Sequence, residues 1–169
     1  MSNVKVTGVK ELVISYKKAG KDIQKECAYI LSANAMIGRN EAVRNAPIAF
    51  GKLRQSIGIE TSADRLEQAV VVNADYAPFV EFGTGGKVSV PSEWQQMANG
   101  FRGQKMSNDD ILERLRDWCR LKGIDEKYAY PIMISNFKEG LDPQPFMYPA
   151  WEKVKKQFSR DMINFMRNG

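Results

Sequence analysis

The sequence predicts an α+β fold in which a long N-terminal helix and a C-terminal helix pack on an antiparallel sheet of three to four strands. Three observations support it. A long helical pattern opens the chain, short strand-like stretches follow, and a second helical pattern closes the chain. The segment between the strands and the last helix, residues 86–143, reads as a loop with a helical insertion. We expect a single domain over residues 1–169.

The first helical pattern runs from Val9 to Ala46. Its apolar residues recur at steps of three and four, as expected for one long amphipathic helix or for two helices meeting near Gly20. Pro47 must end the helix, because proline lacks an N–H and disfavours helical backbone at the residue before it.

Two stretches after the helix read as antiparallel strands. Residues 56–61 alternate apolar and polar side chains, as a half-buried strand does. Residues 66–73 contain a run of β-branched residues. The polar residues 62–65 between them predict a turn, so the two strands should form a hairpin.

A third strand is predicted over Tyr76–Phe82, bent at Pro78, which favours an edge position or a bulge. Val88 and Val90 are compatible with a further short strand. The polar segment 91–106 that follows is interpreted as a long mobile loop.

Helix boundaries are clearer in the rest of the chain. Ser107 is a good N-cap for a helix that Gly123 should end. A shorter helix is expected over 131–138, ended by Gly140. Pro149 suits the first turn of a C-terminal helix. The apolar stripe of that helix consists of Trp151, Val154, Phe158, Met162, Phe165 and Met166.

The composition argues against most enzyme and metal-site classes. The chain contains no histidine, which removes the commonest general base and the commonest metal ligand. Acidic pairs stand at helix starts, where they complement the helix dipole. We expect no catalytic, metal or cofactor-binding residue. Cys27 and Cys119 lie at apolar helical positions and should be buried and reduced.

The net charge of +5 comes from the segments on either side of residues 86–142, which are neutral together. The C-terminal helix is basic. Such a helix can contact nucleic acid, but it more often only solvates one side of an amphipathic helix. A small basic nucleic-acid-binding module therefore remains an alternative function.

Two other classes are disfavoured. The segment Gly83–Val88 resembles a phosphate-binding loop only superficially, because Glu81 stands where the first glycine of that motif belongs and Val88 replaces its hydroxyl residue. No stretch approaches the roughly 18 apolar residues of a membrane span. The first residues also lack the apolar core of a secretion signal. We expect no membrane partner and folding in a cytoplasm.

Three short segments stand out. The first motif is Ala46-Pro47 followed by Gly51-x-Leu53-Arg54-x-Ser56-Ile57. The second motif is Tyr76 followed by Val80-Glu81-Phe82-Gly83-Thr84. The third motif is Pro145-Phe146 followed by Pro149-Ala150. In this order they resemble the tail-completion proteins of tailed bacteriophages and prophages, also called head–tail joining or neck proteins.

The resemblance implies a structural virion protein that forms a hexameric ring in the neck or at the top of the tail. Such a ring completes the tail and joins it to the DNA-filled head, and it is assembled in the host cytoplasm. Its partners would be other copies of itself, a head-closure or connector protein, and a tail terminator or tail tube protein. DNA would pass through the lumen without sequence-specific binding.

Within this interpretation, the second motif and the glycines after it are the expected subunit interface, because an exposed strand edge can be completed by another chain. The interface residues would be Tyr76, Val80, Glu81, Phe82, Gly83, Thr84, Gly85, Gly86 and Lys87. The other motif residues, which are expected to support the fold, are Gly51, Leu53, Arg54, Ser56, Pro145, Phe146, Pro149 and Ala150.

Overall fold

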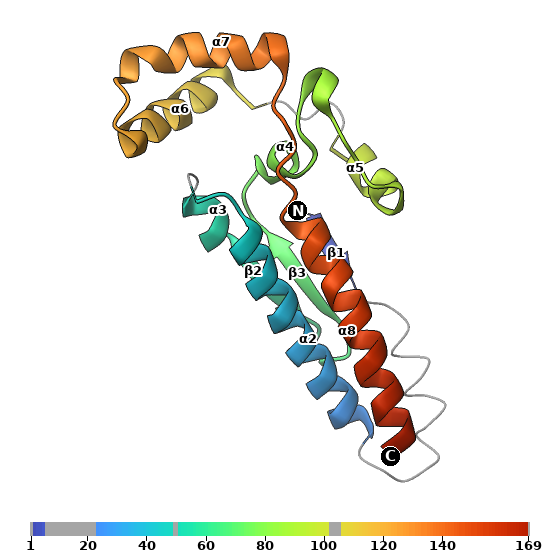
Figure 1. The fold of residues 1–169 in the computed structure, drawn as a ribbon. Coiled ribbons are helices and arrows are strands. Elements are labelled where there is room, and N and C mark those ends of the chain that lie inside the picture. Colours follow the sequence, from blue (N-terminus) through green and yellow to red (C-terminus); the bar gives the residue numbers. More distant parts are fainter. Residues whose placement is uncertain (1, 6–22, 49–50, 102–105, 169) are drawn as a thin grey trace.

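The computed structural model of the chain describes residues 2–5, 23–48, 51–101 and 106–168. Over these residues the fold is α+β, as predicted. Two long antiparallel helices, α2 (Ile23–Asn45) and α8 (Met147–Asn168), lie side by side on one face of a small sheet (Figure 1).

The sheet has the order β1-β3-β2, with β1 (Ser2–Lys5), β2 (Ile57–Thr61) and β3 (Gln68–Val72) all antiparallel to their neighbours. The predicted hairpin is confirmed. Its turn is closed by the Arg65 N–H, which donates to the Ser62 carbonyl over 2.9 Å. The sequence did not predict that β1 pairs with β3 on the side opposite to β2.

The predicted third strand is wrong. Ala77–Phe82 form a helix of six residues, α4, with Pro78 in its first turn. Proline is well suited there, because its fixed φ is helical and its missing N–H has no helical partner anyway. The strand suggested for Val88 and Val90 is also absent from the described sheet, and Gly85–Lys87 form a short 3₁₀ turn, η2, just before it.

The described part of the first helix ends as predicted. The Ala46 N–H donates to the Ala42 carbonyl over 2.9 Å, and the chain turns at Pro47. Residues 9–22 of the predicted helix lie outside the described residues. Gly38 is required for packing, because a Cβ there would come within 2.9 Å of Val154 on α8 and 3.4 Å of Val70 on β3. A glycine thus lets the helix approach both neighbours closely.

The long polar loop expected over residues 91–106 is wrong in its first part, and residues 102–105 lie outside the described chain. Ser92–Trp94 form a 3₁₀ turn, η3, and Gln95–Asn99 form a short helix, α5. The Trp94 side chain is buried in the main core. An aromatic ring among polar neighbours gives no periodic signal, which explains why the sequence did not reveal its burial.

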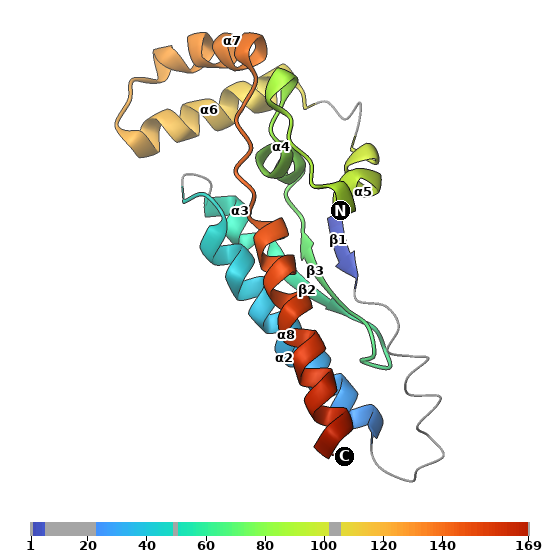
Figure 2. The ribbon, with the colours of Figure 1, turned by 45° about the vertical axis from the view of Figure 1, so that its right-hand side comes forward.

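The two predicted insertion helices are confirmed as α6 (Asn108–Lys122) and α7 (Ala129–Glu139), joined through the 3₁₀ turn η4 (Glu126–Tyr128). The Ser107 side chain caps α6 by accepting from the Asp110 N–H, and Gly123 ends it in a left-handed conformation. The helices α6 and α7 form a hairpin that projects beyond the C-terminal end of α2 (Figures 1 and 2). We call it the α6–α7 hairpin.

Two buried clusters hold the rest together. The larger one lies where α3 (Gly51–Gln55), α4 and the start of α8 meet, with Leu53 and Phe146 fully buried in it. The smaller one joins the start of α2 to the end of α8 through Cys27, Leu31 and Met162. Cys27 and Cys119 are both free and buried, as predicted.

We predict that Leu53→Ala lowers the free energy of unfolding by about 2–5 kcal/mol, because it removes a fully buried side chain and leaves a cavity. Urea unfolding followed by circular dichroism measures the change. The matched control is Ile48→Ala, since Ile48 is 78% exposed and should change stability by no more than about 0.5 kcal/mol. Equal effects of the two substitutions would contradict the assignment of the core.

Candidate assembly site

The first motif closes the C-terminal end of α2. The carbonyl of Ala46 accepts two hydrogen bonds from the Arg54 guanidinium, from Nε at 2.9 Å and from Nη2 at 2.7 Å. Carbonyls at a helix end lack helical partners, and a cation there also complements the helix dipole. Ser56 donates from Oγ to the Leu53 carbonyl over 2.8 Å. These contacts turn the chain from helix to sheet.

The second and third motifs meet through the Glu81 carboxylate. Its Oε2 accepts from the N–H groups of Phe146 and Met147 at 2.8 and 2.9 Å, and its Oε1 accepts from the Tyr148 N–H at 2.9 Å. These three donors belong to the start of α8, whose N–H groups have no helical partners. Glu81 is therefore a cap supplied by another helix, and it ties α4 to α8.

The carboxylate of Glu81 lies in an apolar setting, with only 5% of the residue exposed. Burial raises the pKa of Glu81 above its ordinary value, and the three backbone N–H groups limit that rise. Phe82 and Phe146, which flank these hydrogen bonds, are also buried. A buried polar group is tolerated in a protein core when it is hydrogen-bonded, and here each carboxylate oxygen has at least one N–H donor.

A second set of bonds lies beside this cap, where the chain leaves the core and later returns. The Thr84 N–H donates to the Leu141 carbonyl over 3.0 Å, and the Leu141 N–H donates to Thr84 Oγ1 over 2.8 Å. The Gln144 N–H donates to the Val80 carbonyl over 2.8 Å. Residues 85–140 therefore leave the core and return to it at one place, where Val80–Thr84 lies against Leu141–Gln144. We call this place the crossing.

Two glycines make the crossing possible. Gly83 and Gly140 have φ values of 76° and 77° with nearly extended ψ, a conformation that is essentially restricted to glycine. A Cβ on Gly83 would lie 2.6 Å from the Leu141 carbonyl oxygen, and one on Gly140 would collide with the Thr84 carbonyl oxygen. The glycine of the second motif is therefore needed for close backbone contact.

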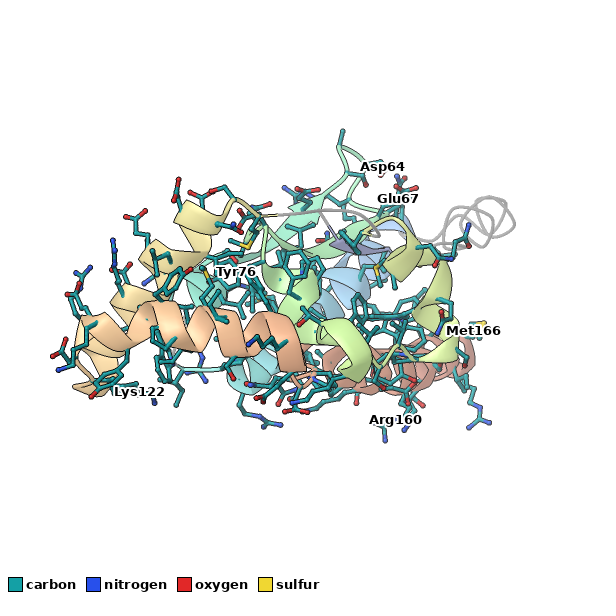
Figure 3. The ribbon with its side chains drawn as sticks, turned by 90° about the horizontal axis from the view of Figure 1, so that it is seen from above. Asp64, Glu67, Tyr76, Lys122, Arg160 and Met166 are labelled. Atoms are coloured by element: carbon teal, nitrogen blue, oxygen red, sulfur yellow. The ribbon has the colours of Figure 1, made fainter. Side chains whose placement is uncertain are left out.

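The α6–α7 hairpin is fixed to the body near this crossing. Arg114 on α6 pairs with Asp75 at 3.0 Å, and its guanidinium lies 4.5 Å from the ring centre of Tyr76. Figure 3 shows Tyr76 at the base of the hairpin and Lys122 at its far end. Lys87 pairs with Asp142 at 3.1 Å on the other side of the base.

The segment before the hairpin is anchored as well. The Trp94 ring packs edge-on against Phe82, Tyr148 and Trp151, with centroids 5.3–6.3 Å apart. Glu93 pairs with Lys155 of α8 at 2.8 Å. The insertion is thus held at both of its ends.

The structure divides the residues predicted as the interface into three groups. Tyr76, Glu81, Phe82 and Gly83 are buried, whereas Val80 and Thr84 are half-buried. Only Gly85, Gly86 and Lys87 are exposed. The interface stays a prediction, with these three residues as its accessible part, since most of the others hold the fold together. In the third motif, Phe146 and Ala150 are buried, while Pro145 and Pro149 are exposed.

Sequence reasoning missed a set of exposed apolar side chains on two helices. Tyr29 and Met36 on α2 are 73% and 60% exposed, and Tyr130 and Phe137 on α7 are 58% and 54% exposed. Each pair is seven residues apart, which places its members on one face of a helix. This spacing was the available signal, but only the fold shows that these side chains are exposed.

The described part of the chain contains no group of three or more cysteine and acidic side chains placed to hold a metal ion. No helix in it combines the length and apolarity required to cross a bilayer.

Residues 10–83 match the family model HK97-gp10_like, described as "Bacteriophage HK97-gp10, putative tail-component". The matched segment contains the first motif, and it ends at the glycine of the second motif. Residues 10–83, fewer than half of the chain, are similar to the HK97 gp10-like family. This confirms the resemblance to a tailed-phage tail component. No curated protein and no solved structure matches the chain.

The match to a phage tail component implies a virion location and points to a structural role rather than an enzymatic one. The matched segment covers α2, α3, β2, β3 and α4. The α6–α7 hairpin and α8 lie outside it. The Glu81 cap therefore joins the family segment to a helix beyond the match.

We predict that Glu81→Gln lowers the free energy of unfolding by about 1–3 kcal/mol, because an amide offers one acceptor where the carboxylate offers two, and it leaves a buried N–H without a partner. Thermal or urea unfolding measures the effect. Glu113→Gln is the matched control, since Glu113 is exposed on α6. If both variants are as stable as the parent chain, Glu81 is not the cap that we describe.

We also predict that Gly83→Ala is more destabilising than Gly123→Ala. Both glycines have positive φ, but a Cβ on Gly123 would meet no atom within 4 Å. The Gly123 change should cost about 1–2 kcal/mol for its left-handed backbone. The Gly83 change adds the collision with Leu141, and unfolding midpoints compare the two. Equal losses would exclude a close backbone crossing at Gly83.

Proposed function

We propose that the chain is a structural subunit of a homo-oligomeric ring in the neck or at the top of the tail of a tailed phage. The ring completes the tail and joins it to the DNA-filled head. The observation that supports this most directly is the HK97 gp10-like match over residues 10–83. The order of the three motifs along the whole chain supports the finer assignment to tail completion.

The geometry of the motifs agrees with a structural role. Arg54, Glu81 and Gly83 have their polar or backbone contacts within the chain, at the junctions of α2, α4 and α8. None of these contacts prepares a reacting atom. They fix the relative positions of the helices and thereby the shape of the surface that the subunit offers to its neighbours.

A ring built from one kind of subunit needs two different patches on each copy, because a head-to-tail contact closes by rotation. We propose a hexamer as the closed form. Its outer partners would be a head-closure or connector protein on one side and a tail terminator or tail tube protein on the other. The exposed turn Gly85–Lys87 is the part of the predicted interface that is accessible for such contacts.

DNA would pass through the lumen of the ring without sequence-specific contacts. Exposed basic residues on α8 favour this: Lys156, Arg160 and Arg167 lie four and seven residues apart, on one side of the helix. The same face supports the second candidate, a nucleic-acid-binding module. That function would require strong binding of free DNA by the isolated chain, with an affinity that falls steeply as salt rises.

We predict that phage particles made without this protein stop at the joining step. Electron microscopy of the lysate should show DNA-filled heads beside complete but separate tails, and expression of the chain in trans should restore joined particles. The protein is removed by a nonsense codon early in the gene. A silent change at the same codon is the control, because it alters the nucleotide sequence and leaves the protein intact. Joined, infectious particles without the protein would overturn the proposed function.

A further inference from the structure

The α6–α7 hairpin is the part of the molecule that neither the family match nor the three motifs explain. It lies between the two glycines of the crossing and outside residues 10–83. The Arg114 contacts with Asp75 and Tyr76 hold its base against the body. It projects from the body as a pair of helices rather than as an irregular loop (Figures 1 and 2).

Within the described residues, the two helices of the hairpin pack against each other. The inner faces of the two helices bury Cys119, Ala129 and Met133. A different face of α7 carries Tyr130 and Phe137, more than half exposed, with half-buried Ile134 between them. The steps of four and three residues make one continuous apolar stripe. We call it the α7 stripe.

A second stripe of the same spacing lies on the body. Tyr29 and Met36 of α2 are exposed, and Ala33 between them is half-buried. The core residues of α2, such as Cys27, Leu31 and Gly38, lie on the opposite side of that helix. We call Tyr29, Ala33 and Met36 the α2 stripe. In both ribbon views the hairpin lies beyond the end of α2.

We infer that the α7 stripe of one subunit packs on the α2 stripe of the next copy in the ring. This rests on the proposed function and identifies the surfaces that build the ring. The two stripes are different patches on one chain, as a head-to-tail contact requires. Both are helical faces that include an aromatic residue, and they can pack as ridges into grooves.

Charge favours a second copy as the occupant. Residues 107–142 contain eight acidic and six basic residues, whereas the remainder of the chain contains twelve acidic and nineteen basic residues. The hairpin of one subunit is therefore attracted to the body of another. The exposed turn Gly85–Lys87 lies against α7 and joins the hairpin base through the Lys87–Asp142 pair, so it would border the same contact.

Disulfide cross-linking in assembled particles tests the contact. Phage lacking the gene are complemented with the Met36→Cys plus Phe137→Cys variant, and purified virions are oxidised and analysed on a non-reducing gel. The natural cysteines are fully buried and should not interfere. The expected result is a ladder of cross-linked multimers. Either single variant, and the control pair Met36→Cys plus Ile163→Cys, should leave the protein monomeric.

A charge exchange gives a second readout. Phe137→Glu should reduce the yield of infectious particles by about tenfold or more, as loss of a central apolar contact does. In the inferred contact Phe137 of one copy packs on Met36 of the next, so adding Met36→Lys should restore the yield to within about threefold, because the two new charges attract each other. Ile163→Glu on α8 is the control for a charge at an exposed apolar site. Unchanged melting temperatures show that each variant still folds.

The outcomes separate this contact from the proposed function. If the double-cysteine variant enters infectious virions but stays monomeric, or is cross-linked to a different virion protein, the inferred contact is wrong and the joining role stands. If virions contain none of the protein and form normally without it, the joining role fails, and this contact fails with it.

Discussion

The buried carboxylate of Glu81 is the interaction on which the rest of the structure depends. It accepts three N–H groups at the start of α8 and so fixes the end of the family segment to the last helix. Because α8 packs along α2, the cap also sets the direction of the two-helix layer on the sheet. The adjacent glycine crossing then determines where the insertion leaves the core. One carboxylate thus connects the HK97 gp10-like segment to the last helix.

Local signals in the sequence predicted those elements whose boundaries are decided by single residues. Pro47, Ser107, Gly123 and Gly140 each end or begin a helix for a reason that acts within a few residues, and these boundaries are confirmed. The strand predicted over Tyr76–Phe82 was wrong, because short apolar runs with aromatic residues suit a strand or a buried helical turn equally well. In the folded chain, tertiary packing favours the helix.

Long-range contacts lay beyond sequence reasoning. Glu81 finds its donors 65 to 67 residues later, and Trp94 packs against rings from both α4 and α8. The second and third motifs could be recognised as segments, but no pattern in either one states that they bind each other. The most distinctive residues of the second motif therefore build the core. Exposed apolar stripes lie elsewhere, for example on α2 and α7.

The central claim is that this chain forms a ring between head and tail, and a reconstruction of the intact neck by cryo-electron microscopy tests it most directly. Our account predicts a closed ring of copies around the DNA channel, with α2, α8 and the sheet of each copy recognisable in the density. Absence of this fold from the neck and the top of the tail, with the protein found elsewhere in the particle or not at all, would contradict the account.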